Sequence, residues 1–213
     1  MNLNTKKIFI DCGTNLGDGL AHFHKRYNFS PQWEIYTFEP NPYLKDYIEQ
    51  NIVGKNPQIP IHFFDMALCG NNAPETMEFM MQKVPEHEKP IGGGSTLLGH
   101  DEFKQEELAG YEKVTVKTAR LSNIIKNIAT PYAHVENEAM CFNKSKCMIV
   151  VKLDVEGAEY DIMQDLLDTG AAWAITDLHV EFHSRRFKES KKEEEVRLVG
   201  ELFQRGINLF SHY

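Results

Sequence analysis

Short apolar runs alternate along the chain with stretches in which apolar residues recur every three or four positions. The runs are typical of buried strands, and the wider spacing is typical of helices that cover them. Strands are predicted at 8–10, 35–38, 61–64, 148–153, 174–182 and 207–210, and helices at 19–27, 42–51, 160–169 and 190–203. This alternation predicts an α/β fold: a doubly wound, mostly parallel sheet with helices on both faces.

The stretch from about 71 to 148 departs from this pattern. It holds short extended pieces at 76–80 and 112–117, a glycine-rich loop at 91–97 and a short helix at 121–127. We interpret residues 1–213 as a single domain, in which 71–148 is an elaboration over the edge of the sheet where α/β proteins bind ligands.

Composition narrows the class of protein. The 213 residues carry a formal net charge of −8, which argues against a partner such as nucleic acid, and the basic patch at 184–188 is short. Its four cysteines lack the spacing of a zinc site and suit a reducing compartment. Without an apolar leader or a run of membrane-spanning length, a cytoplasmic protein with no membrane contact is expected.

The turn after the first strand has the pattern Asp-x-Gly-x-x-x-Gly over residues 11–17, and the dinucleotide pattern GxGxxG is absent. Such a turn brings backbone close to a ligand. Asp11 can accept a hydrogen bond from an ammonium group, whereas Asp11 and Asp18 disfavour a pyrophosphate. These acids fit the cationic amino-acid end of S-adenosylmethionine. The alternative is a plain tight turn with a solvated acid.

Acids also end the next two strands. Glu39 stands where an acid accepts both hydroxyls of an adenosine ribose, although it could instead stabilise the N-terminus of the following helix. Asp65 suits a contact to an adenine amine against the apolar wall of Met66 and Ala67. Together with the first turn, these residues favour a nucleoside-bearing ligand.

The segment after the strand at 148–153 places Asp154, Glu156 and Glu159 within six residues. Carboxylates at a sheet edge are costly unless they meet a cation, a metal or a proton-bearing substrate. Glu159 is explained by the first turn of a helix. Alternation places residues 179, 181 and 183 on one face of the next strand. The candidates for proton transfer are Asp154, Glu156, Glu181 and His183, while His179 is more typical of a core histidine.

The same cluster could instead hold a divalent cation that clamps a sugar diol, with Asp154, Glu181 and His183 as ligands. We favour a general base without a metal, because the sequence does not require one. Ser95 and Thr96, in the glycine-rich loop, are predicted to donate hydrogen bonds to the substrate as part of a mobile lid. A solvated loop is the alternative.

Four segments resemble the FkbM family of S-adenosylmethionine-dependent methyltransferases: 10–18, 38–42, 65–68 and Lys152-Leu-Asp-Val-Glu-Gly-Ala-Glu159, the last being the most family-specific. The resemblance implies a class I, Rossmann-like methyltransferase fold and methyl transfer to a hydroxyl of a sugar or glycan. The predicted cofactor contacts are Asp11, Gly13, Asn15, Gly17, Glu39, Pro40, Asp65, Met66 and Ala67.

Two alternatives stay open. One is a metal-assisted O-methyltransferase of a small-molecule or polyketide hydroxyl. The other is a non-catalytic methyltransferase-like binding module, against which the intact Asp11, Gly13, Glu39 and Asp154 argue. The fold that the resemblance implies normally ends in an antiparallel pair of strands, yet one clear strand follows residue 182, so the topology of that edge stays open.

Overall fold

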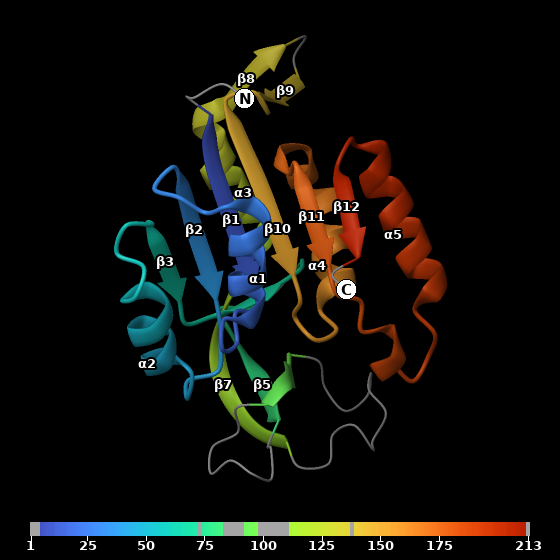
Figure 1. Ribbon diagram of the computed structural model, residues 1–213. Helices are drawn as coiled ribbons and strands as arrows, with labels where there is room; N and C mark the ends of the chain where they lie inside the picture. The colour runs from blue at the N-terminus through green and yellow to red at the C-terminus, as the bar shows by residue number, and fades with distance from the viewer. Residues whose placement is uncertain (1–4, 72–73, 83–91, 98–110, 137–138, 212–213) are drawn as a thin grey trace.

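The computed structural model describes residues 5–71, 74–82, 92–97, 111–136 and 139–211. Its main sheet has the strand order β12-β11-β10-β1-β2-β3, and every neighbouring pair is parallel (Figure 1). The strands are β1 (Lys6–Cys12), β2 (Trp33–Phe38), β3 (Ile61–Phe64), β10 (Cys147–Leu153), β11 (Asp177–Val180) and β12 (Asn208–Ser211). The predicted α/β fold with a parallel sheet is confirmed.

Helices cover both faces of this sheet. They are α1 (Asp18–Tyr27), α2 (Lys45–Ile48), α3 (Leu121–Ala129), α4 (Glu159–Asp168) and α5 (Lys192–Gln204). Ile8 and Ile10 of β1 pack with α3, α4 and α5, whereas Phe9 packs with α1 and α2. Successive side chains of a strand point to opposite faces, so this alternation separates two apolar cores. Burial on both faces leaves the strand ends as the places where polar residues meet a ligand.

A second sheet lies beyond the carboxyl ends of the main strands (Figure 1). Its order is β4-β7-β5-β6, with β4 (Ala67–Cys69), β5 (Thr76–Gln82), β6 (Gly92–Thr96) and β7 (Tyr111–Arg120). The hairpin of β8 (Ala133–Glu136) and β9 (Ala139–Phe142) lies at the opposite end of the main sheet. The second sheet therefore comes from the segment expected to elaborate the ligand-binding edge.

The last part of the chain corrects one expectation and answers the question of edge topology that the sequence left open. The strand predicted over 174–182 is confined to β11, because Gly170 ends α4 in the left-handed region and a 3-10 turn follows at Ala171–Ala174. The C-terminal strand β12 pairs with β11 in parallel. Among the described residues, the main sheet therefore contains no antiparallel hairpin at this edge.

Three local predictions also need correction. The helix expected from residue 42 is regular only from Lys45 and continues as a π-helical turn, Glu49–Val53. The helix expected from Ser190 begins at Lys192, whose N–H lies 3.4 Å from Ser190 Oγ. Residues 92–96 form strand β6 and not a loop, because their backbone pairs with β5; residue 91 lies outside the described residues. None of the described helices is long and apolar enough to cross a membrane.

Candidate active site

The carboxyl ends of β1, β2 and β10 open into one cavity of about 310 Å³, and the second sheet forms its far wall. Parallel α/β sheets bind their ligands at this edge. The lining residues that matter below are Gly13, Thr14, Asn15, Asp18, Glu39, Pro40, Met66, Ala67, Phe79, Gly93, Ser95, Lys152, Asp154, Glu156 and Glu181.

The turn after β1 is locked against the turn after β10. Gly13 has a φ of 86°, and a Cβ atom there would lie 1.9 Å from the carbonyl oxygen of Asp154. Only glycine combines this backbone conformation with so close an approach. The Asp154 N–H donates to the carbonyl of Cys12 at 3.2 Å. The glycine turn after β1 and the turn after β10, here called the acidic turn (residues 154–159), therefore pack together as one floor of the cavity.

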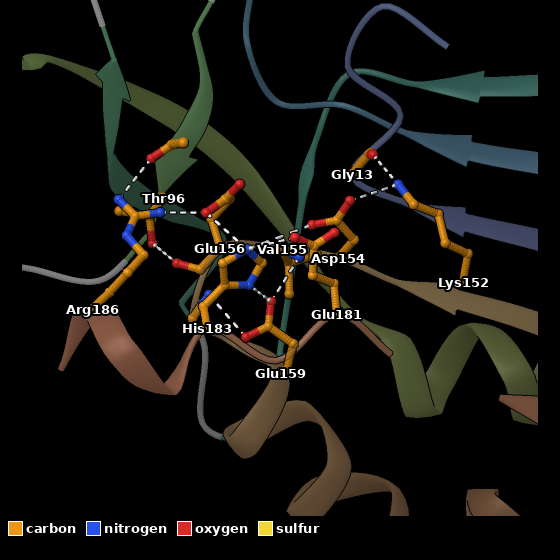
Figure 2. Close-up of polar contacts among 12 residues, drawn as sticks. Gly13, Thr96, Lys152, Asp154, Val155, Glu156, Glu159, Glu181, His183 and Arg186 are labelled. Carbon is orange, nitrogen blue, oxygen red and sulfur yellow. Dashed lines mark hydrogen bonds and ion pairs between the residues drawn. The ribbon is translucent and has the colours of Figure 1, made fainter. Parts of the chain in front are cut away.

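A buried lysine pairs with two acids, Asp11 beneath the turn and Asp154 at the cavity. Lys152 Nζ lies 3.3 Å from Asp11 Oδ1. It also lies 3.2 Å from Asp154 Oδ2 and donates a hydrogen bond to the Gly13 carbonyl at 2.6 Å (Figure 2). Burial acts to lower the pKa of Lys152, but the carboxylates of Asp11 and Asp154 outweigh it and the pKa is raised. The lysine is therefore a permanent cation that pairs with both acids.

Sequence reasoning missed the role of Lys152, although a signal exists. Asp11 and Lys152 are register partners on the neighbouring parallel strands β1 and β10. Adjacent residues on paired strands share a face of the sheet, so a lysine in an apolar strand beside an acid predicts a buried ion pair. The strand pairing was needed to see it.

Glu39 sits at the end of β2 with its carboxylate turned toward backbone donors. It accepts hydrogen bonds from the N–H groups of Asn15 at 2.8 Å and Asn41 at 2.9 Å. Burial raises the pKa of Glu39 to about 7, in spite of these two bonds. The carboxylate therefore ties the turn after β1 to the turn after β2 and still presents lone pairs to the cavity.

His183 lies at the centre of a ring of carboxylates (Figure 2). Its Nδ1 is 3.0 Å from Glu159 Oε1, and its Nε2 lies 3.1 Å from Glu156, 3.7 Å from Glu181 and 4.0 Å from Asp154. Burial acts to lower its pKa, but the hydrogen bond to Glu159 and the charges around it raise the pKa to about 9. His183 is therefore an imidazolium at neutral pH and holds no free lone pair for a proton.

Glu159 shapes the turn that carries these acids. It is fully buried and accepts hydrogen bonds from the N–H groups of Val155 and Gly157, both at 2.9 Å. Glu156, between them, has a φ of 57°, a conformation that costs free energy outside glycine. The role expected for Glu159, a helix-terminal acid, is thus extended: it also fixes the backbone of the turn and anchors His183.

Several predicted site residues meet in the cavity: Gly13, Asn15, Glu39, Pro40, Met66, Ala67, Ser95, Asp154, Glu156 and Glu181 all line it. Asp11 does not, because it is buried beneath the turn against Lys152. Asp65 forms an ion pair with Lys45 at 3.1 Å outside the lining residues. Thr96 donates to the backbone carbonyl of Glu156 at 2.8 Å and so braces that turn.

Gly17 and His183 are also predicted site residues that are not among the residues lining the cavity. Gly17, with a φ of 88°, precedes α1 and packs on Ile52, where a Cβ would lie 2.6 Å from Ile52 Cδ1. The three residues 179, 181 and 183 do not share a face, because β11 ends at Val180. His179 faces α1, with Nε2 2.7 Å from the Tyr27 hydroxyl, as expected for a core histidine.

The cavity retains one unsatisfied buried group. The Thr14 hydroxyl belongs to a residue that is 2% exposed and lines the cavity, and it has no hydrogen-bond partner among the described residues. A buried hydroxyl without a partner costs free energy, so a polar ligand atom beside it would be stabilising. With the glycine turn and Glu39, this group fits the polar amino-acid and ribose parts of S-adenosylmethionine.

A metal ion has a possible ligand set in the same place. Asp154, Glu156 and His183 can each offer one ligand atom, all within 4.8 Å of one another. The set expected from the sequence contained Glu181 in place of Glu156. A cation bound here would have to replace the Nε2 proton of His183, because a metal binds the unprotonated nitrogen.

Comparison with known proteins identifies a family. A family model described as "Methyltransferase FkbM domain" matches residues 11–206. No curated protein matches the chain. A crystal structure of a methyltransferase FkbM from Methylobacillus flagellatus KT is similar at 12% sequence identity with a TM-score of 0.48, covering 94% of this chain. The chain spans 37% of the length of that protein.

Replacing Lys152 by methionine should destabilise the protein by about 3–5 kcal/mol, because Asp11 and Asp154 lose their buried cation. Denaturant unfolding of Lys152→Met and wild type measures the loss. Lys45→Met is the matched control: the Lys45 and Asp65 side chains are 45% and 43% exposed, so breaking their pair should leave the free energy of unfolding close to that of wild type. Asp11→Asn added to Lys152→Met should recover part of the stability. Equal stability of Lys152→Met and wild type would contradict the argument.

The raised pKa of His183 predicts a pH-dependent stability. Its contribution is complete below the unfolded pKa of 6.5 and is lost as the pH rises through the folded pKa of about 9. The free energy of unfolding should therefore fall by up to about 3 kcal/mol across this window. Comparison with His183→Gln isolates the effect, and an NMR titration of the imidazole measures the pKa directly. A pKa at or below 6.5 would refute the imidazolium assignment.

Proposed function

The chain belongs to the FkbM methyltransferase family, and on that premise we propose that it transfers the methyl group of S-adenosylmethionine to a hydroxyl oxygen of a sugar or glycan. One observation carries the proposal. The glycine turn after β1, Glu39 after β2 and the Asp154 turn after β10 line the same cavity. Backbone groups, an acid suited to a ribose and a candidate proton acceptor would therefore face the space that the cofactor and the acceptor share.

Residues on the β1 and β2 side would hold the cofactor. Glu39 would accept hydrogen bonds from the ribose hydroxyls, Thr14 would bond the amino-acid end, and Met66 and Ala67 would pack against the adenine. S-Adenosylmethionine, when bound, supplies a methyl group activated by the sulfonium. Asp11 would act indirectly, through Lys152, and not by direct contact with the cofactor, since it is buried beneath the turn.

Residues on the β10 and β11 side would prepare the acceptor. Methyl transfer to oxygen requires alignment of the hydroxyl and removal of its proton. We assign the proton acceptor as Asp154, which pairs with Lys152 and packs against the glycine turn after β1. Glu181 would orient the acceptor: its side chain is 32% exposed and makes no hydrogen bond with another described residue. His183 and Glu156 would support these two carboxylates, because His183 is already protonated at neutral pH.

The charge of the cavity favours an uncharged acceptor. Five acidic side chains and one lysine line it among the described residues, and that lysine is committed to Asp11 and Asp154. Among the lining residues that the structure describes, a phosphorylated or carboxylated acceptor would find no cation besides this lysine and would face like charge. Neutral sugar hydroxyls, or hydroxyls beside an ammonium group, fit this environment. The same charge argues against nucleic acid as a partner.

A metal-assisted methyltransferase is a second candidate. The observation in its favour is that Asp154, Glu156 and His183 present ligand atoms within 4.8 Å of one another. A divalent cation there would clamp two oxygens of a diol. The proton on His183 and the ion pair of Glu156 with Arg186 favour the metal-free reaction.

The proposal is tested first by calorimetric titration with S-adenosylhomocysteine and then by methyl transfer to a panel of sugars, with and without a chelator. We expect binding, transfer to neutral sugars, and at least about 30-fold lower kcat/KM for a sugar phosphate than for the matched neutral sugar, because about 2 kcal/mol of repulsion corresponds to that ratio. Loss of activity on chelation would select the metal-assisted reaction. Binding without transfer would indicate a binding module, and no binding would reject the cofactor.

The two acceptor-side carboxylates should separate kinetically. Asp154→Asn should lower kcat by about 100-fold or more, since removal of a proton acceptor typically costs 10²–10⁴. Glu181→Gln should chiefly raise the KM of the acceptor, because orientation and not proton transfer is lost. The exposed pair of Glu78 and Lys113 provides a neutral control in Glu78→Gln. Unchanged kcat in Asp154→Asn would remove Asp154 from the mechanism.

A further inference from the structure

Arg186 is a buried cation that the proposed reaction does not use. It belongs to the short 3-10 turn Ser184–Arg186 after β11 and is 5% exposed. Arginine is almost never buried unless it is paired. Arg185, next to it in the same turn, is exposed. The partners of Arg186 should therefore show what its burial achieves.

These partners lie in the turn after β10 and on strands β6 and β7 of the second sheet. Figure 2 shows Arg186 beside Glu156. Arg186 Nη1 forms an ion pair with the Glu156 carboxylate. Its Nη2 donates to the Gly94 carbonyl at 2.9 Å and to the Tyr111 hydroxyl at 2.8 Å. The Tyr111 hydroxyl in turn donates to the Gly94 carbonyl at 3.0 Å. One guanidinium thus connects the acidic turn of the main sheet with β6 and β7 of the second sheet.

Strand β6 depends on such side-chain bonds because its backbone pairing is limited. It lies at the edge of the second sheet, and its register with β5 shifts between the pairs Met80↔Thr96 and Gln82↔Gly92. The Gly94 N–H donates to the side-chain oxygen of Gln82 at 2.9 Å. Gly93 and Ser95 of this strand line the cavity. Side-chain hydrogen bonds therefore add to the backbone pairing with β5 in holding this wall.

Thr96 provides a second link from the same strand. Its hydroxyl donates to the backbone carbonyl of Glu156 at 2.8 Å. Glu156 is consequently held through its backbone by Thr96 and through its carboxylate by Arg186 and His183. A residue held at three points, with a φ of 57°, is a fixed element of the site and not a mobile one.

We propose that Arg186 is a positioning residue that fixes the β6 wall of the cavity against the Glu156 turn and so sets the affinity for the acceptor. The part of this inference that concerns the acceptor rests on the proposed methyl transfer. The part that concerns β6 does not. Arginine suits this place because its planar fork reaches a carboxylate, a carbonyl and a hydroxyl at once, which a lysine cannot do.

Hydrogen–deuterium exchange tests the wall without any acceptor. In Arg186→Ala, amides of residues 92–96 should exchange at least about 10-fold faster than in wild type, because the wall opens more often. Arg185→Ala is the matched control and should leave this exchange unchanged. In Arg186→Lys, residues 92–96 should exchange more slowly than in Arg186→Ala and faster than in Arg185→Ala. Added guanidinium ion at low millimolar concentration should restore protection in Arg186→Ala by occupying the vacated place. Unchanged exchange at 92–96 overturns the proposal.

Kinetics test the acceptor. With a sugar that wild type methylates, Arg186→Ala should raise the acceptor KM by about 10-fold or more, while the Kd of S-adenosylhomocysteine changes by less than about 3-fold. Guanidinium should lower that KM again. Equal losses in both affinities would show a general structural role and overturn the proposal. If Arg186→Ala does not fold, Arg186→Lys and Tyr111→Phe carry the same comparison. A wild type that fails to bind S-adenosylhomocysteine rejects the proposed function, yet the exchange comparison still decides the role of Arg186 in the wall.

Discussion

The buried contact of Lys152 with Asp11 and Asp154 is the interaction on which the candidate site depends. It lies between the two central strands, where β1 and β10 are paired in parallel and buried on both faces. Burying a charged group is costly unless it is paired, and the ammonium of Lys152 pairs with both carboxylates. The same ammonium also donates to the carbonyl of Gly13. Charge balance and the geometry of the glycine turn are therefore set by one side chain.

The acidic turn also holds its carboxylates by pairing them with cations and hydrogen-bond donors. Its carboxylates are held close together because cations and backbone N–H groups stand between them: His183 and Arg186 at Glu156, and His183 with two N–H groups at Glu159. Glu181 is the acid with the least support, and it is also the one that is most exposed toward the cavity. A ligand therefore meets a preorganised set of acids in which most of the repulsion has already been offset. This arrangement explains how the site can attract neutral or cationic groups although its acids lie close together in the folded protein.

The sequence predicted the main sheet well because its signals are local. Apolar runs, helical spacing and turn residues act over a few positions, and they located the six strands of the main sheet and the helices beside them. Predictions failed where the outcome depends on a neighbour. Residues 92–96 read as a loop because glycine and serine have little strand propensity, yet pairing with β5 makes them a strand. The strand at 174–182 was overextended because an apolar run does not distinguish a short strand from a preceding 3-10 turn.

The candidate site likewise has features that local sequence predicts and features that depend on distant neighbours. The sequence by itself determined which strand ends carry acids and glycines, since the motifs at 11–17 and 154–159 and the acid at 39 are contiguous or stand at fixed places in a βαβ unit. Only the tertiary structure decided which acid faces the cavity, which is buried beneath it and which histidine is charged. Those properties depend on cations that lie far away in the chain: Lys152 is 141 residues from Asp11, and Arg186 is 30 residues from Glu156. Desolvation and charge act through space, so the ionisation of a group and the side it presents are fixed only when the sheets have assembled.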